Sequence, residues 1–218
     1  MNAYFITGTD TGVGKTLVGG AVASALTRSG KKVGVLKPFE TGCEPGAEGL
    51  VPADALFLKE MAHCPEDIAT ICPFPMITPL APAVAAAIEN IPVDLEKIKT
   101  VFSRMRGHYD VILVEGAGGL MVPLDPGLTN IDLMQDWNLP VVLVSAYYLG
   151  SINHTLLSVE ALVSRHISIS GLVFNGEPVD STRQAILEST GLPVLLEIER
   201  TAHIDADWVN EQAGRLSL

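Results

Sequence analysis

The chain has 218 residues, of which 48% are hydrophobic and 18% are charged. This composition is typical of a globular protein of ordinary domain size and excludes a disordered chain. The net charge of −11 provides no broad basic surface, so we expect no nucleic-acid partner.

Three features bear on where the protein works. No C-x-x-C pair is formed by the three cysteines, Cys43, Cys64 and Cys72, which favours reduced thiols over a disulfide framework or a structural zinc site. The first residues enter an apolar segment without a basic lead or a cleavage site, so we expect no signal peptide. The longest apolar run, residues 81–88, is too short to span a bilayer. We therefore predict a cytoplasmic protein that does not associate with membranes.

Apolar, β-branched runs alternate along the chain with amphipathic stretches, as in the β–α units of a parallel sheet. In chain order, the first half predicts a strand at 3–7, a glycine-rich loop, a helix at 16–28, a strand at 32–37, a helix at 52–62, a constrained loop at 72–82 and a helix at 83–89. The second half predicts a helix at 94–106 capped by Asp94, then strands at 110–115, 141–145, 171–175 and 194–198 with helices between them. We therefore predict one doubly wound α/β domain over residues 1–218, with a mostly parallel sheet.

The sequence Gly8-Thr-Asp-Thr-Gly-Val-Gly-Lys-Thr16 lies between the first predicted strand and the first predicted helix. Glycines let the backbone approach a phosphate, and the amides and dipole of a helix start attract its charge. Lys15 would reach the β- and γ-phosphates, and the Thr16 hydroxyl would bind Mg²⁺. The usual pattern has glycine where this chain has Thr9, and an ordinary glycine-rich turn is the alternative interpretation. The position between strand and helix favours phosphate binding and a fold of the P-loop NTPase type.

Acids that could hold Mg²⁺ beside a phosphate also follow from the pattern. The strand at 110–115 ends in Glu115, and Gly116-Ala-Gly-Gly119 follows directly. Because the carboxyl ends of parallel strands line the ligand crevice, Glu115 should face the phosphates; capping of a neighbouring helix is its alternative role. Lys37 should lie over the same crevice, although spacing alone favours a solvated charge. Asp54, taken alone, is typical of an acid in the first turn of a helix.

Five segments occur in a single order along the chain: Gly8 to Thr16, Lys37-Pro38 with Thr41-Gly42, Asp54-Ala55, Val114-Glu-Gly-Ala-Gly-Gly119 and Leu149-Gly-Ser-Ile-Asn-His154. Together they closely resemble the dethiobiotin synthetase family, over residues 3 to about 176. The resemblance implies an ATP- and Mg²⁺-dependent cyclo-ligase of biotin biosynthesis. Its substrates would be diaminopelargonic acid, CO₂ and ATP. It also implies a homodimer whose substrate site lies at the subunit interface.

The resemblance implies roles for individual residues as well. The ATP-binding set would be Thr11, Gly12, Val13, Gly14, Lys15, Thr16, Leu17, Asp54, Glu115, Gly116, Ala117, Gly118, Asn175 and Gly176. Within it, Thr16, Asp54 and Glu115 would hold Mg²⁺. Lys15 and Lys37 would be the catalytic lysines, with Lys37 stabilising a substrate carbamate. The substrate would be bound by Thr41, Gly150 and Asn153.

Some segments leave alternatives open or depart from the family pattern. Asn175 resembles an asparagine that binds the purine, although Asn175-Gly176 also suits a turn that ends a strand. The late segment Leu196-Glu-Ile-Glu-Arg200 lacks the glycine and proline that border adenine in the family, which predicts a weaker base preference. Tyr148 stands where many relatives have a basic residue, which would alter how the substrate carboxylate is held.

Other classes of protein share the predicted fold. A partition or septum-site ATPase switch is the main alternative, but it would carry a signature lysine where this chain has Asp10. The ATP-binding half of a cobyrinate-type amide synthetase would need a glutaminase domain, for which this sequence leaves no residues. A non-catalytic nucleotide-binding module would leave Lys37, Asp54 and Glu115 unexplained together.

Overall fold

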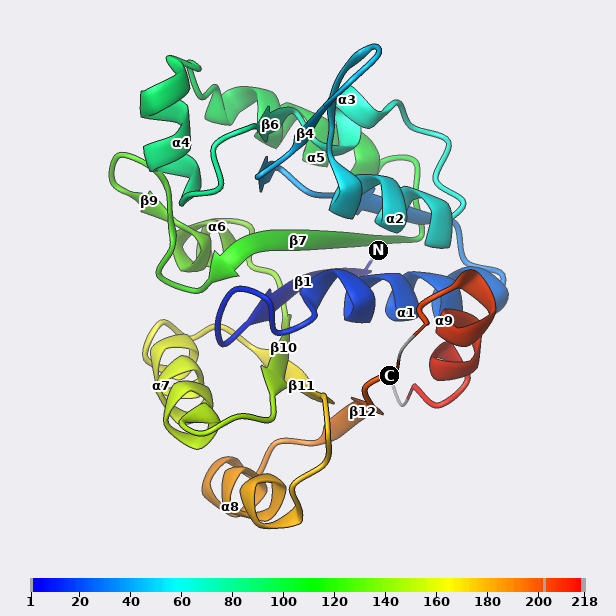
Figure 1. The fold of residues 1–218 in the computed structure, drawn as a ribbon, viewed down its shortest axis with the longest axis vertical. Helices are drawn as coiled ribbons and strands as arrows, with labels where there is room; N and C mark the ends of the chain where they lie inside the picture. Colours follow the sequence, from blue (N-terminus) through cyan, green and yellow to red (C-terminus); the bar gives the residue numbers. More distant parts are fainter. Residues whose placement is uncertain (1, 202, 217–218) are drawn as a thin grey trace.

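The computed structural model describes residues 2–201 and 203–216 (Figure 1). Its strands are β1 (Asn2–Gly8), β2 (Val33–Leu36), β3 (Phe39–Thr41), β4 (Glu44–Gly46), β5 (Gly49–Val51), β6 (Phe74–Met76), β7 (Val111–Gly119), β8 (Pro123–Asp125), β9 (Leu128–Thr129), β10 (Val141–Ala146), β11 (Ile169–Asn175) and β12 (Val194–Ile198). Its helices are α1 (Lys15–Arg28), α2 (Ala53–Met61), α3 (Ile68–Ile71), α4 (Pro82–Glu89), α5 (Leu95–Arg106), α6 (Asn130–Asp136), α7 (Ser151–Ser164), α8 (Asp180–Thr190) and α9 (Ala206–Ala213).

Six strands form one parallel sheet in the order β12-β11-β10-β1-β7-β2. The central strand β1 pairs with β10 on one side and β7 on the other, so that Phe5 lies in register with both Val141 and Val114. The chain first moves outward from β1 to β2, returns to β7, and then builds the other half of the sheet. This order confirms the predicted α/β fold with its mostly parallel sheet, and it brings the carboxyl ends of the central strands to one edge.

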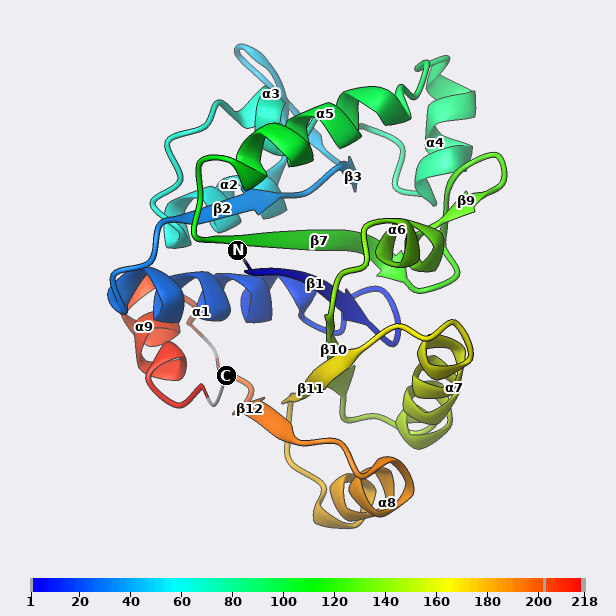
Figure 2. The same ribbon diagram turned by 180° about the vertical axis from the view of Figure 1, so that it is seen from behind.

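Helices cover both faces of the sheet (Figures 1 and 2). On one face, α1 packs against β1 and β7 and also contacts α2 and α9. On the other face, α5, α6 and α7 pack against β7 and β10. Because both faces are covered, the inner strands are buried on both sides, which explains their continuous apolar runs, such as residues 141–144 of β10.

Three differences from the predicted elements have physical causes. Strand β7 does not end at Glu115 but continues through the four small residues to Gly119, with a register shift against β1 between Ile6 and Gly8. Within the predicted loop at 72–82, residues 74–76 form β6, which pairs in parallel with β3. The short pairs β4–β5 and β8–β9 were not predicted, because strands of two or three residues carry no periodic signal. Helix α9 was not predicted either.

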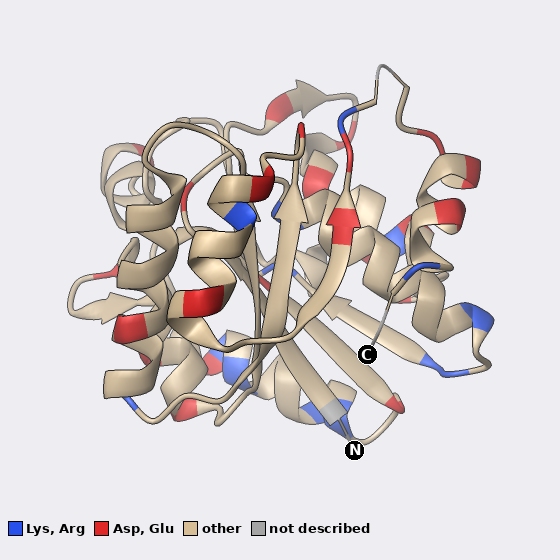
Figure 3. Ribbon diagram, turned by 90° about the horizontal axis from the view of Figure 1, so that it is seen from below, with Lys and Arg blue, Asp and Glu red and all other residues tan. Residues whose placement is uncertain are grey.

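The described residues can be compared with two expectations from the sequence, on membrane spans and on basic surfaces. No helix among them has both the length and the hydropathy needed to cross a bilayer. Lys and Arg lie scattered singly over helices and loops, interspersed with Asp and Glu, in the view of Figure 3.

Candidate functional site

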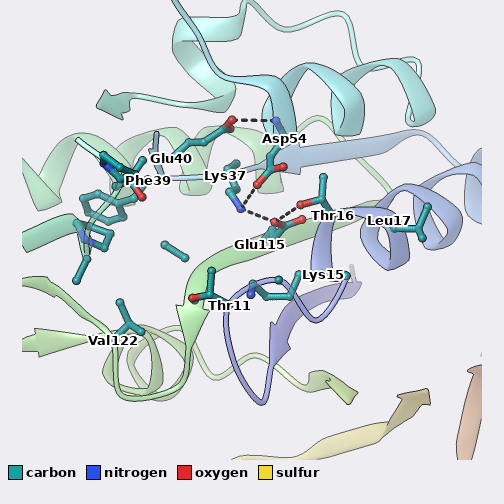
Figure 4. A pocket seen from close by; sticks show the side chains of 18 of the residues that line it. Thr11, Lys15, Thr16, Leu17, Lys37, Phe39, Glu40, Asp54, Glu115 and Val122 are labelled. Atoms are coloured by element: carbon teal, nitrogen blue, oxygen red, sulfur yellow. Dashed lines mark hydrogen bonds and ion pairs between the residues drawn. The ribbon is translucent and has the colours of Figure 1, made fainter. Parts of the chain in front are cut away.

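A cavity of ≈ 630 Å³ lies at the carboxyl edge of the sheet, between the loop after β1 and the starts of α2 and α4. The residues expected from sequence that line it are Thr11, Gly12, Gly14, Lys15, Thr16, Leu17, Lys37, Thr41, Asp54, Glu115, Ala117, Gly118 and Asn175. They come from segments that are far apart in the chain, and the parallel sheet brings them together (Figure 4). Val13, Gly116, Gly176, Gly150 and Asn153 are not among the lining residues.

The glycine-rich loop ends in a tight turn that starts helix α1. Gly14 is the N-cap of the helix, with φ 97°, a backbone conformation that side chains other than glycine rarely adopt. A Cβ atom at Gly14 would lie 2.1 Å from Asn175 Nδ2, so the packing also requires glycine. The free amides at the start of α1 therefore open directly onto the cavity, as anion binding requires.

Lys15 follows Gly14 and is largely buried. Its Nζ donates a hydrogen bond of 2.9 Å to the Asp10 carbonyl, so that the side chain arches over the loop. Burial, together with the positive charge of Lys37, lowers the pKa of Lys15 to about 8. The charge of the Lys15 ammonium is therefore not fully balanced by neighbouring carboxylates, and a bound anion can supply the missing negative charge.

A second lysine forms the centre of an ion-pair cluster at the same edge (Figure 4). Lys37 Nζ lies 3.0 Å from Asp54 Oδ2 and also contacts Glu115 Oε1. The Thr16 hydroxyl donates a 2.9 Å hydrogen bond to the same Glu115 oxygen. Lys37 is 3% exposed and Glu115 is 1% exposed, so the pair that these two residues form is shielded from solvent.

The cluster keeps Lys37 ionised. Burial alone would lower the pKa of Lys37, but the carboxylates of Glu115 and Asp54 outweigh it and raise this pKa above its usual value. Lys37 is therefore a fixed positive charge at neutral pH and not a proton acceptor. Such a charge can stabilise an anion that forms beside it.

The oxygens around Lys37 are of the type that Mg²⁺ prefers. Asp54 and Glu115 already hold one cationic group between them, and the Thr16 hydroxyl is within hydrogen-bond distance of Glu115. No group of three or more His, Cys, Asp or Glu side chains suited to a metal occurs among the described residues. Two carboxylates and a hydroxyl match a Mg²⁺ that takes its other ligands from phosphates and water, and do not match an all-protein metal site.

Asn175 stands at the end of β11, where it links that strand to the glycine-rich loop. Its Nδ2 donates a 2.9 Å hydrogen bond to the Val13 carbonyl. Gly176 follows with φ 114° and forms the turn that ends the strand. The Asn175 side chain thus both binds the backbone of the glycine-rich loop and lines the cavity.

The segment around α7 lies apart from this cavity. Gly150 is the N-cap of α7, with φ 106°, and Asn153 is exposed in its first turn. Tyr148 makes a 2.7 Å hydrogen bond to His154 Nδ1 across the same turn. Thr41, by contrast, ends β3 and lines the cavity.

Several lining residues were not predicted as site residues from the sequence. Phe39, Leu80, Val122 and Ile204 supply apolar walls, and no periodic pattern distinguishes them from ordinary core or loop residues. Glu40 also lines the cavity, beside the predicted Lys37 and Thr41. The helix start at Asp54 was visible in the sequence, but its contact with Glu40 depends on tertiary folding.

Comparisons with known proteins agree with this geometry. A family model described as an AAA domain matches residues 2–207. The ATP-dependent dethiobiotin synthetase of Thermodesulfovibrio yellowstonii is 44% identical over 203 residues, covering 89% of this chain and 83% of that protein. The enzyme of the same name from Halalkalibacterium halodurans is 36% identical over 202 residues, again covering 89% and 83%.

Among solved structures, the similarity extends to other nucleotide-dependent proteins. The cell division ATPase MinD of Pyrococcus furiosus superposes with a TM-score of 0.57 at 18% identity, covering 98% of this chain and 97% of that one. A ParA family ATPase from Chlorobium tepidum gives a TM-score of 0.57 at 16% identity, covering 97% and 88%. At these identities the likeness establishes the P-loop NTPase fold and nothing more. The sequence relatives are far closer, and the chain belongs to the family of ATP-dependent dethiobiotin synthetases.

Proposed function

We propose that the protein closes the cyclic urea of dethiobiotin from 7,8-diaminopelargonic acid and CO₂ at the expense of ATP. One amine of the substrate captures CO₂ as a carbamate and releases a proton. A carbamate oxygen then attacks the γ-phosphorus of ATP, and ADP departs. The product of this step is a carbamic–phosphoric anhydride. The second amine attacks the carbamate carbon, phosphate departs, and the ring is closed.

In this proposal the nucleotide phosphates lie over the glycine-rich loop, from Thr11 to Leu17, and along Gly116 to Gly118. Lys15 neutralises the β- and γ-phosphates. Support comes from its buried position at the cavity wall and from the helix amides that start beside it. Asn175 and Gly176 border the purine, where the carboxamide oxygen of Asn175 would accept from a base amino group because its nitrogen binds Val13.

Thr16, Asp54 and Glu115 would hold Mg²⁺, which when bound would neutralise the negative charge of the phosphates. Support comes from the convergence of these three side chains on one point that already holds a positive group. Lys37, now paired with the two carboxylates, would then be free to turn toward the carbamate. The carbamate would then replace the two carboxylates as the counter-charge that keeps the buried Lys37 protonated, and Lys37 would stabilise the carbamate and the developing charge of the transferred group.

The substrate would lie between Thr41 and the apolar walls of the cavity, completed by a second copy of the chain. The partner subunit's Gly150 and Asn153 would bind its other end. Exposed apolar side chains on α4 and beside α7, among them Val84, Ile88 and Leu149, support such a homodimer. Both elements lie on the side of the molecule toward which β7 points (Figures 1 and 2).

The proposed site of action is the cytoplasm. All three cysteines lie within the described residues and are free and buried. Thiols in this state fit a reducing compartment.

The observation that carries the proposal is the pairing of Lys37 with both Asp54 and Glu115 inside a cavity that begins at the helix start of Lys15. A phosphate-release assay with diaminopelargonic acid, bicarbonate and Mg²⁺-ATP tests it, with mass detection of the cyclic product. Phosphate release should require the diamine and should match the ring product mole for mole. Release that ignores the diamine would favour a nucleotide-driven switch instead.

A further inference from the structure

Glu40 is a buried carboxylate in the short strand β3, and it reaches across to helix α2. The residue is 7% exposed. Its Oε1 accepts the backbone N–H of Asp54 at 2.9 Å (Figure 4). Its Oε2 accepts the backbone N–H of Ala55 at 3.0 Å. Both oxygens of one side chain are therefore occupied by two successive amides at the start of a helix.

These two amides have no local partner. The first amides of a helix lack intrahelical acceptors, and the N-cap side chain normally accepts one of them. The N-cap of α2 is Pro52, which has no side-chain oxygen, and no side-chain cap is formed there. Glu40, which precedes the helix by more than ten residues, supplies the acceptors that Pro52 lacks.

One of the two amides bound by Glu40 belongs to Asp54, which lines the cavity. Asp54 lies in the first turn of α2, and its carboxylate is 3.0 Å from Lys37 Nζ. Its side chain is 44% exposed, so surrounding packing does little to hold it. The position of the Asp54 backbone therefore determines where the carboxylate lies. Glu40 fixes this backbone by binding the amide of Asp54 and the amide of the next residue, Ala55.

We propose that Glu40 is a positioning residue, which caps α2 from outside the helix and thereby aims the Asp54 carboxylate at the metal and at Lys37. This inference rests on the proposed function, in which Asp54 binds Mg²⁺. Glu40 is not itself a ligand of the metal, since both its oxygens are used by amides. Partners that orient a metal ligand commonly affect metal affinity by an order of magnitude or more.

The test is the Mg²⁺ dependence of ATP binding in Glu40→Gln. Glutamine has the same shape, but its NH₂ group faces an amide donor where an acceptor is needed. We expect the Mg²⁺ concentration that gives half of the metal-dependent gain in ATP affinity to rise roughly tenfold. ATP affinity in the absence of metal should stay unchanged, and the amides of Asp54 and Ala55 should exchange hydrogen faster.

Two further variants separate positioning from a general loss of structure. Adding Pro52→Ser to Glu40→Gln provides a local cap, and it should restore the Mg²⁺ response. Asp94→Ala is the matched control, because it removes the acceptor of the Lys97 amide at the start of α5, away from the cavity. It should lower thermal stability and leave the Mg²⁺ response unchanged.

A wild-type Mg²⁺ response in Glu40→Gln would overturn the inference, as would a double variant no better than the single one. An equal loss of metal-free ATP binding would also overturn it, because positioning of a metal ligand does not predict that loss. The variant Asp54→Asn distinguishes a failure of the proposed metal site from a failure of the inference about Glu40. If Asp54→Asn retains the full Mg²⁺ response, the proposed metal site is wrong. If it loses the response while Glu40→Gln keeps it, only the inference about Glu40 fails.

Discussion

Lys37 is a buried lysine whose charge is balanced by Glu115 and Asp54. Because its role is to stabilise the carbamate, Lys37→Ala should lower kcat by about 10²–10³-fold, the usual cost of removing a group that stabilises transition-state charge. The Kd for Mg²⁺-ATP should change by less than about threefold, since Lys15 and the helix amides remain.

Steady-state kinetics and calorimetry on the same preparation measure both quantities. Lys31→Ala removes an exposed lysine and is the matched control, expected to behave as the unmodified enzyme. Equal losses of turnover and of ATP affinity in Lys37→Ala would assign Lys37 to nucleotide binding instead.

Lys15 makes ATP binding depend on pH. In the ligand-free protein its pKa is lowered to about 8, by burial and by Lys37. Below this pH the ammonium is present and the affinity should be constant. Above it the free protein has lost the proton that binding must recover, so the Kd for ATP should rise by up to about tenfold per pH unit.

Calorimetry between pH 6.5 and 9.5 would reveal this step. The guanidinium of Lys15→Arg does not titrate in this range, so that variant should give a flat profile even if its affinity is lower. A flat profile in the unmodified protein would contradict the role of Lys15.

Elements with strong local signals could be predicted from the sequence, and elements formed by distant contacts could not. The six strands of the main sheet are apolar runs bounded by turn residues, and each was located within a few residues. Strand β7 was predicted too short, because Gly116 to Gly119 look like a loop and extend only through pairing with β1. Strands β3 and β6 depend on a pairing of Glu40 with Pro75 that no local pattern indicates.

The same distinction holds for the candidate site. The glycine-rich loop was visible because its residues are contiguous, and the topology of a parallel sheet predicted that Lys37 and Glu115 lie at the same edge. Asp54 was assigned to the site only by the resemblance to the family. The salt bridge between Lys37 and Asp54 could not be predicted, since it depends on how α2 is held. Nor could the hydrogen bond from Asn175 to Val13, which joins residues that are far apart in the sequence.

We expect the segment from Leu196 to Arg200, which spans the end of β12, to affect how strictly the base is recognised. Glu197, within the segment that lacks the family's glycine and proline, pairs with Arg183 on α8 and does not line the cavity. Beyond β12, Ile204 lines the cavity with an apolar side chain that offers no base-specific hydrogen bond. We therefore expect kcat/KM for ATP to exceed that for GTP or CTP by no more than about tenfold.

Phosphate release with each nucleotide at saturating diamine measures this preference. A preference for ATP of several orders of magnitude would show that the altered segment still recognises adenine.

The whole molecule leaves an apolar surface uncovered in two places, before α7 and on α4. Leu149 is fully exposed at the start of α7, and Val84 and Ile88 are exposed one turn apart on α4. If this surface is the dimer interface, Leu149→Asp should shift the protein to monomers and raise the KM for the diamine. Because Leu149 makes no buried contacts within one chain, the Leu149→Asp monomer should melt at the same temperature as an unmodified monomer.

Analytical ultracentrifugation and kinetics on Leu149→Asp check this prediction. Val179→Asp, at the start of α8, places the same charge at another exposed apolar residue and should remain dimeric. A dimer that survives Leu149→Asp with an unchanged KM would place the interface elsewhere.

Four segments meet at the carboxyl edge of the sheet: α1, the residue after β2, α2 and β7 bring Thr16, Lys37, Asp54 and Glu115 together there. A crystal structure with Mg²⁺ and a non-hydrolysable ATP analogue tests this claim most directly. We predict phosphates on the amides at the start of α1 and a metal ion held by Thr16, Asp54 and Glu115, with Lys37 turned toward the γ-phosphate. Phosphates bound elsewhere, or a metal ion that avoids Asp54 and Glu115, would contradict it.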